Sequence, residues 1–155
     1  MAGLYYEEFS VGQLFAHVMR RTVTEADNTF FSALTHNPAA LHLDEEYCKG
    51  TEFGQRIVNS AFTLGLMVGI SVNDTTLGTT VANLGWDAVR FPKPLFHGDT
   101  VRVESEVLSL RDSASRPDNG VVVFAHRAFN QHDVLVASCE RTALMLRLPE
   151  GGRDS

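Results

Sequence analysis

The chain has 155 residues, enough for one domain with a sizeable core, and its formal net charge is −6. An acidic balance disfavours nucleic acid as a partner, because phosphate binding takes a basic face. Two widely separated cysteines, Cys48 and Cys139, match no metal or redox spacing and are expected to be reduced thiols. The first residues lack the basic and apolar stretches of a secretion signal, so we expect a cytoplasmic protein.

The amino-terminal part is predicted to contain a strand and a short helix. Residues 14–23 alternate loosely between apolar and polar side chains, which predicts the strand. Thr24 is a favourable N-cap, and Asp27 three residues later is an acidic first-turn residue. Apolar positions follow at Phe30, Phe31 and Leu34. This pattern predicts a short amphipathic helix that ends near Thr35.

Residues 35–44 are rich in turn formers. Proline disfavours helical geometry in the residue before it, so Asn37, which precedes Pro38, predicts a loop. This loop would hold Asn37 and His42 in a fixed relation, five positions apart. Residues 44–50 are then predicted to form one or two helical turns that end at Gly50.

Residues 61–72 form an apolar run that is too short to span a bilayer, and we expect no membrane partner. The run predicts a helix that is buried on most sides, begins at about residue 58 and ends near Asn73. The polar loop before it would lie at the N-terminal end of that helix. A His and an Asn at such a place are well positioned for chemistry.

From residue 79 onward the pattern is extended. Strands are predicted over residues 79–91, 100–110, 121–130 and 134–146. One long helix ahead of these strands predicts an α+β fold in which an antiparallel sheet wraps around the helix. We expect a single domain over residues 1–148 and a frayed polar tail over residues 149–155. A small curved sheet leaves an edge that pairing would cover, so we also expect a homodimer or a larger even homo-oligomer.

The order of these elements resembles the MaoC-like branch of the hotdog fold, which includes (R)-specific enoyl-CoA hydratases and mesaconyl-CoA-type hydratases. The resemblance covers residues from about 9 to 146. Its most specific part is Phe91-x-x-Pro94-x-x-x-Gly98-Asp99, which is similar to a strand-to-strand turn of the family. Hydratases of this family carry an Asp and a His five residues apart and a Val-His-Gly-like turn before the helix. Here His42 stands at the His position, Asn37 at the Asp position, and Val58-Asn59-Ser60 at the turn.

The resemblance implies hydration of a 2-enoyl thioester, in which water adds across a C=C bond conjugated to a carbonyl. This reaction needs a base for water, an acid for the α-carbon, and donors for the enolate-like oxygen. His42 is the expected acid–base group. Asn37 cannot be a base, but it can orient a water; its alternative role is that of a turn residue. Asp44, two residues after His42, is a candidate for tuning the histidine or replacing the missing acid.

Four further residues are candidates for binding the substrate. Asn59 and Ser60 at the helix start are explained by capping, and the same helix terminus is a candidate oxyanion and substrate-binding site. Arg90 and Lys93 are candidates for the phosphates of coenzyme A, although exposed surface charge is the commoner role of such residues.

We therefore expect a hydro-lyase acting on a 2-enoyl-CoA, including a short, branched or carboxylated acyl group of the mesaconyl type. A hotdog thioesterase and a non-catalytic acyl-CoA-binding subunit with a decayed dyad are the alternatives. The polar side chains near His42 favour the lyase, because a decayed pocket would fill with apolar residues. We expect no cofactor beyond the coenzyme A of the substrate, and no metal, because no ligand set has a usual spacing.

Overall fold

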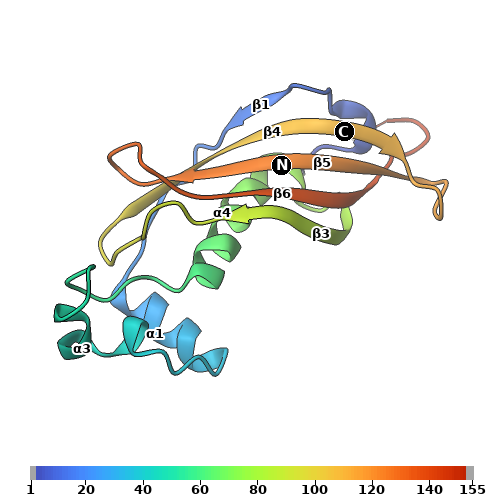
Figure 1. Ribbon diagram of the computed structural model, residues 1–155. Coiled ribbons are helices and arrows are strands. Elements are labelled where there is room, and N and C mark those ends of the chain that lie inside the picture. Colours follow the sequence, from blue (N-terminus) through green and yellow to red (C-terminus); the bar gives the residue numbers. More distant parts are fainter. Residues whose placement is uncertain (1–2, 153–155) are drawn as a thin grey trace.

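The computed structural model describes residues 3–152, in which one curved sheet wraps around one long helix (Figure 1). After a short 3-10 helix, η1 (Tyr6–Glu8), the chain enters the sheet. The strands lie in the spatial order β1 (Leu14–Ala16), β4 (Thr100–Asp112), β5 (Asn119–Phe129), β6 (Leu135–Leu146) and β3 (Thr80–Arg90), and β2 (Arg21–Thr22) pairs separately with β4. All neighbours are antiparallel. The predicted α+β hotdog fold is confirmed.

The four long strands begin and end within two residues of the predicted bounds. Along β4 the side chains alternate between buried and half-buried up to Val107, which reflects the period of two read from the sequence. The last three residues of the predicted polar tail, 153–155, lie outside the described residues.

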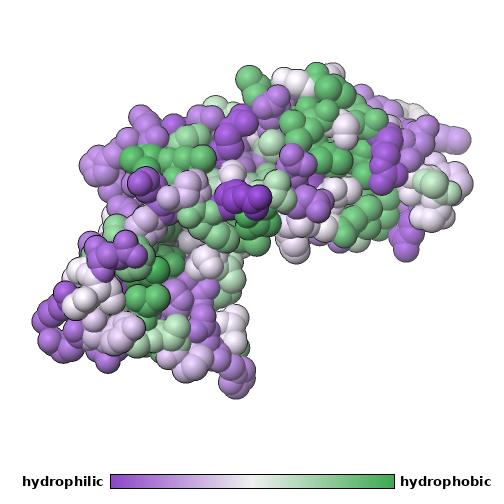
Figure 2. All heavy atoms as spheres, viewed as in Figure 1, coloured by the Kyte–Doolittle hydropathy of each residue, from purple (hydrophilic) through white to green (hydrophobic). Residues whose placement is uncertain are grey.

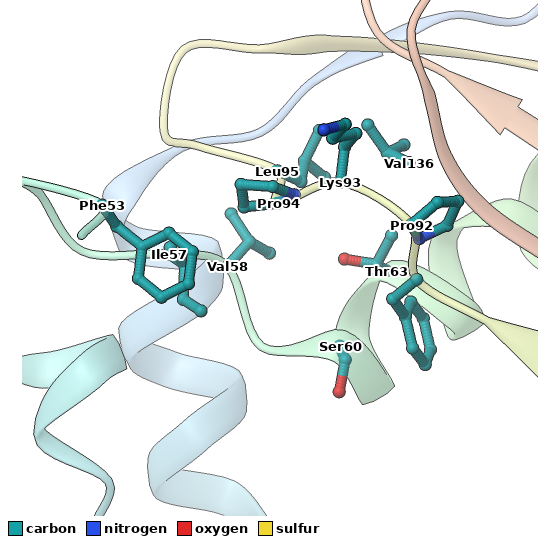
Figure 3. Close-up of a pocket in the computed structure, with 11 residues that line it drawn as sticks. Phe53, Ile57, Val58, Ser60, Thr63, Pro92, Lys93, Pro94, Leu95 and Val136 are labelled. Carbon is teal, nitrogen blue, oxygen red and sulfur yellow. The ribbon is translucent and has the colours of Figure 1, made fainter. Parts of the chain in front are cut away.

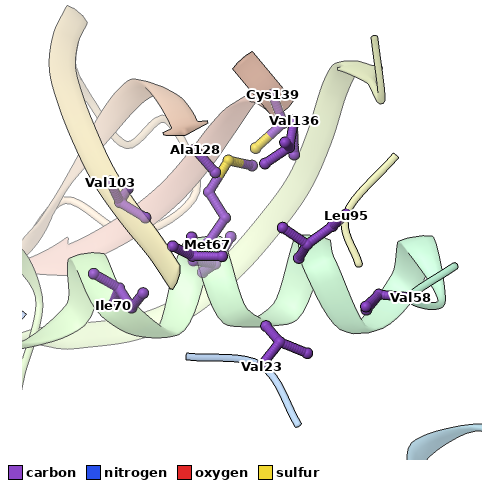
Figure 4. Packing of buried hydrophobic residues seen from close by; sticks show 12 residues of the cluster. Val23, Val58, Met67, Ile70, Leu95, Val103, Ala128, Val136 and Cys139 are labelled. Carbon is purple, nitrogen blue, oxygen red and sulfur yellow. The ribbon is translucent and has the colours of Figure 1, made fainter. Parts of the chain in front are cut away.

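Helix α4 (Ser60–Thr75) begins and ends about two residues later than expected. Met67 and Ile70 on its inner side pack against Val103 of β4, Ala128 of β5 and Val136 of β6 (Figure 4). The expectation that this helix is buried on most sides is wrong for its outer side, where small residues are exposed, because the sheet covers only one side of the helix. These exposed residues are Ser60, Ala61, Gly65, Gly69 and Asn73. Within residues 3–152 no helix has the length and apolar character needed to cross a membrane.

The continuous strand predicted over residues 14–23 is wrong. Residues 17–20 separate β1 from β2, and Val18 is 90% exposed. The interruption falls at His17, whose ring turns inward and forms hydrogen bonds with Asp74 at 2.9 Å and Ser105 at 2.7 Å. The loosely alternating segment therefore forms two short strands, one on each side of the buried and hydrogen-bonded His17.

Three short helices form a lobe that projects from the sheet (Figure 1). In Figure 2 this lobe is a separate part of the surface, with a hollow between it and the part of the molecule that contains the sheet. The three helices are α1 (Glu25–Leu34), α2 (Ala40–Leu43) and α3 (Glu45–Lys49). The N-cap predicted at Thr24 and the helical turns predicted up to Gly50 are confirmed. The loop predicted over residues 35–44 is wrong in its second half, because residues 40–43 form one turn of helix.

The inner side of α1 is polar. Phe30 and Leu34 are 69% and 66% exposed, whereas Asn28 and Ser32 are the buried residues of this helix. Two of the three predicted apolar positions therefore face outward, whereas Phe31 is half-buried and packs edge-to-face on Phe62 of α4. Arg56, which forms ion pairs of 2.8 Å with Glu25 and 2.7 Å with Glu45, ties α1 to α3 and fixes the lobe.

A row of hydrogen-bonded polar side chains crosses the core beside the second half of α4. The ring of His17 contacts the carboxylate of Asp74 on one side and the hydroxyl of Ser105 on the other. The same hydroxyl contacts Nδ1 of His126 at 2.6 Å. His126 is fully buried, and burial, followed by the positive charge of Arg141, lowers its pKa to about 3. The imidazole is therefore neutral at physiological pH.

We expect the free energy of unfolding to fall by about 1 kcal/mol between pH 6.5 and pH 5.5 because of His126. The unfolded chain takes up a proton on this histidine near its ordinary pKa, about 6.5, and the folded protein does so only near pH 3. Stability is therefore lost as the pH falls below about 6.5. In urea unfolding at the two pH values, the dependence should be smaller by about 1 kcal/mol in His126→Leu and unchanged in His132→Gln, which alters an exposed histidine. An equal dependence in wild type and His126→Leu would contradict the assignment.

Candidate active site

His42 lies in α2, one of the helices of the lobe, and is half-buried. Its Nδ1 lies 2.9 Å from the carbonyl oxygen of Ile57. A carbonyl oxygen only accepts hydrogen bonds, so Nδ1 carries the hydrogen. The neutral ring then has its lone pair on Nε2, which is the form required of a general base. The short helix and this single hydrogen bond together fix both the orientation and the tautomer of His42.

Asn28 of α1 is the centre of the hydrogen-bond network around His42. It is fully buried, and its Oδ1 accepts the backbone N–H of Asn59 at 2.9 Å. Its Nδ2 donates to the carbonyl oxygen of Ile57 at 3.0 Å and lies 3.4 Å from that of His42. The same Nδ2 is 2.9 Å from Nε2 of His97. One buried amide therefore joins the lobe, the segment that leads into α4, and the loop before β4.

Sequence reasoning missed both Asn28 and His97. Because Asn28 donates to Nε2 of His97, the neutral ring of His97 carries its hydrogen on Nδ1. Burial, and then the nearby Arg56 guanidinium, lower the pKa of His97 below its usual range. The available signal was the pair of polar residues Asn28 and Ser32, four positions apart on a helix whose apolar residues lie elsewhere.

The start of α4 leaves the hydrogen-bond donors of Ser60 available. Asn59 is buried, and its Oδ1 accepts the N–H of Ala61 at 3.0 Å while its Nδ2 donates to Ser32 at 3.3 Å. The Asn59 side chain is thus committed to capping and packing. Ser60 is exposed, and neither its N–H nor its hydroxyl has a hydrogen-bond partner among residues 3–152. At the positive end of a 16-residue helix, this N–H is placed to bind a developing negative charge.

A cavity of about 310 Å³ opens at this end of α4 (Figure 3). Its walls are mostly apolar, and Ser60 and Thr63 of the first helical turns add hydroxyl groups. Lys93 lines it from the loop after β3, between two prolines. His42 does not line the cavity, but Ile57, to which its ring is bound, does. The complete set of lining residues is Phe53, Ile57, Val58, Ser60, Thr63, Phe91, Pro92, Lys93, Pro94, Leu95 and Val136.

The other predicted site residues lie apart from the cavity wall. Asn37 accepts the N–H of Ala39 on its Oδ1 at 3.0 Å, which is the geometry of an Asx turn, and no hydrogen bond joins it to His42 in the described chain. Asp44 accepts the N–H of Tyr47 at 2.9 Å and caps α3. Arg90 is exposed at the end of β3 and donates to the carbonyl oxygen of Val89.

A sheet wrapped around one helix, with a histidine beside the N-terminus of that helix, places this protein in the hotdog class. A family model described as "MaoC like domain" matches residues 8–126, and the chain belongs to this family. Among curated relatives, a mesaconyl-CoA hydratase of Cereibacter sphaeroides is 33% identical over 144 residues, which cover 93% of this chain and 41% of that protein. The chain therefore spans less than half the length of that relative.

Two solved structures are similar over nearly their whole length. An Archaeoglobus protein described as a monoamine oxidase regulatory protein has a TM-score of 0.85 and 30% identity, with 96% of this chain and 98% of that chain covered. An (R)-hydratase from A. caviae has a TM-score of 0.72 and 26% identity, with 90% and 98% covered.

Proposed function

We propose that this protein is a hydro-lyase that adds water to, or removes it from, the C=C bond of a 2-enoyl-CoA. The observation that carries the proposal is that Ile57, whose carbonyl oxygen fixes the His42 ring, lines the same apolar cavity as Ser60, whose N–H has no partner among the described residues. The similarity to a mesaconyl-CoA hydratase and to an (R)-hydratase supports it.

In the proposed reaction the thioester carbonyl oxygen lies at the Ser60 N–H, and a water lies at Nε2 of His42. The histidine takes a proton from the water as its oxygen adds to the β-carbon. Charge develops on the thioester oxygen, where the N–H and the positive end of α4 stabilise it. The α-carbon then takes a proton, which His42 can return. Asn37 retains its Nδ2 to orient the water, because only its Oδ1 is used in the turn.

The proposal also includes how the acyl group and coenzyme A bind, which cofactors take part and where in the cell the protein is located. The apolar cavity would hold the acyl thioester, and Lys93 in its wall and Arg90 outside it would meet the phosphates of coenzyme A. No other cofactor takes part. Cys48 and Cys139 are free and buried, which fits the reducing cytoplasm that we propose as its location.

Incubation with crotonyl-CoA, mesaconyl-CoA and saturated acyl-CoAs tests the function. A hydratase lowers the absorbance of the enoyl thioester without releasing thiol. Thiol release from saturated acyl-CoAs would instead identify the thioesterase alternative. No change with any of these compounds, under conditions where the protein is folded, would contradict both and favour a binding subunit.

Asn37→Asp restores the carboxylate that the hydratases of the family carry, and we expect it to keep or raise the turnover of crotonyl-CoA. An aspartate can accept the same Ala39 N–H, so the turn should persist. If the natural substrate carries a carboxylate, the variant should lower the turnover of mesaconyl-CoA more than that of crotonyl-CoA, because like charges repel. Steady-state kinetics with both compounds measure this ratio. A loss of activity with crotonyl-CoA alone would contradict the proposed role of Asn37.

We further propose that a second copy of the chain pairs along β3. This strand is hydrogen-bonded to β6 on one side only among the described strands, and Leu84 and Trp86 on it are exposed. Sedimentation at micromolar concentration should give a dimer or a larger even oligomer. Leu84→Lys should shift it toward monomer, and a clean wild-type monomer would contradict the proposal.

A further inference from the structure

Arg141 of β6 is a buried cation that has no counter-ion among residues 3–152. Its side chain is 1% exposed, and Nε and Nη2 are enclosed with no hydrogen-bond partner. In the described chain it takes part in no ion pair, whereas the more exposed arginines Arg21, Arg56, Arg102, Arg127 and Arg147 each contact at least one carboxylate. Burial lowers the pKa of Arg141 to about 10, so the guanidinium stays charged at neutral pH. An unpaired charge at such a position destabilises the fold, which calls for a physical reason.

The surroundings hold the guanidinium in place without neutralising it. Its Cζ lies 5.1 Å from the centre of the Phe124 ring, a cation–π contact that covers one face of the group. His126 lies diagonally across on β5, and its Nε2 is also unpartnered. That ring is neutral, so it adds no second positive charge and provides no counter-ion.

A second cavity, of about 260 Å³, opens onto Arg141. It lies between the second half of α4 and the strands β3 and β6, and Thr76, Thr80 and Asn83 add polar groups to its wall. The side-chain amide of Asn83 has no hydrogen-bond partner among residues 3–152 and offers a further donor. The volume is well above the roughly 30 Å³ of a single water, so a small organic ion fits.

We infer that this cavity is a binding site for a small carboxylate, which Arg141 receives as its counter-ion. A planar carboxylate matches the planar guanidinium, and charge-assisted hydrogen bonds of this kind are among the strongest in proteins. Binding of a carboxylate at this site does not depend on the proposed hydro-lyase activity, so the inference goes beyond the proposed function.

The site is separate from the candidate active site. On α4, Thr63 lines the first cavity and Val68 the second, five positions further along, which correspond to about 7.5 Å. The two cavities have no lining residue in common. The favoured source of the carboxylate is therefore a free small acid, with a carboxylate carried on an acyl-CoA as the other source.

Trp86 provides a direct measurement, because it is the single tryptophan of the chain and is the cross-strand partner of Arg141. The full-length protein is titrated at constant ionic strength with succinate, butyrate and the neutral isostere butyramide, and separately with succinyl-CoA and butyryl-CoA. We expect saturable changes of tryptophan fluorescence with the free acids and none with butyramide. If succinyl-CoA alone gives a change that depends on Arg141, the carboxylate is delivered on a thioester, and the inference still holds.

Arg141→Met should weaken the binding of succinate by about 10-fold or more. It should not lower the unfolding midpoint in buffer without carboxylate, because it replaces an unpaired buried charge with an apolar side chain. Arg127→Met, which removes an equal charge that is paired with Glu106, is the control and should bind as wild type does.

A second variant covers the case in which Arg141→Met does not fold. Asn83→Asp places a carboxylate at an exposed position in the cavity wall, and it should weaken succinate binding to a similar extent by pairing with Arg141 or repelling the ligand. Gln13→Glu adds the same charge elsewhere, where it can still accept the Ser10 N–H, and should have no effect. Equal responses to acids and butyramide, or acid binding unchanged in the folded variants, would overturn the inference.

Discussion

His42→Ala is expected to lower kcat for enoyl-CoA hydration by about 10²–10⁴-fold, the usual range for the loss of a general acid–base group. The reason is structural as well as chemical. Nδ1 is committed to the Ile57 carbonyl, so Nε2 is the one ring nitrogen left for water, and no other titratable ring is fixed in this way at α2. The half-buried ring contributes one hydrogen bond, so the free energy of unfolding should fall by only about 1 kcal/mol.

The measurement is steady-state turnover of crotonyl-CoA with a parallel urea titration. His36→Ala is the matched control, because His36 lies in the same segment and is exposed. We expect this control to retain turnover. An unchanged kcat in folded His42→Ala, for every acyl-CoA that the wild type converts, would move the active site elsewhere.

Asn28→Ala should affect both stability and turnover. It leaves the buried N–H of Asn59 and part of the hydrogen bonding of Ile57 and His97 unsatisfied, so the free energy of unfolding should fall by about 2–4 kcal/mol. The same change releases the segment that holds the His42 ring and the Ser60 N–H, and displacements of about 1 Å at a reacting centre can cost about 10² in rate. We therefore expect a lower kcat at a temperature where the variant remains folded.

Ser32→Ala separates the effect on stability from the effect on turnover. Ser32 is also buried on α1, one turn further along, and accepts a hydrogen bond from Asn59 at 3.3 Å, but it forms no hydrogen bond with Ile57 or His97 in the described chain. It should lower stability by about 1 kcal/mol and leave kcat unchanged. If Asn28→Ala in its folded range has the kcat of wild type, Asn28 stabilises the lobe without positioning His42.

The sequence by itself determined the parts of this protein that depend on local preference and period. The period of two in residues 100–110 predicted β4, the apolar run predicted α4, and Thr24 and Gly50 predicted helix ends, because capping and burial act on residues close in the chain. It also singled out His42 and the Asn59-Ser60 step, since residues before a buried helix lie at its positive end.

Only the tertiary structure decided which of these polar groups are free to act. Asn59 and Asp44 are used by their own helices, and Ser60 is left with an unpartnered N–H. The break at His17 depends on Asp74 and Ser105, which are 57 and 88 residues away in the chain. Asn28, His97 and Arg141 likewise gain their roles from segments far apart in sequence, because whether a polar side chain is buried, paired or left alone depends on what the fold packs against it.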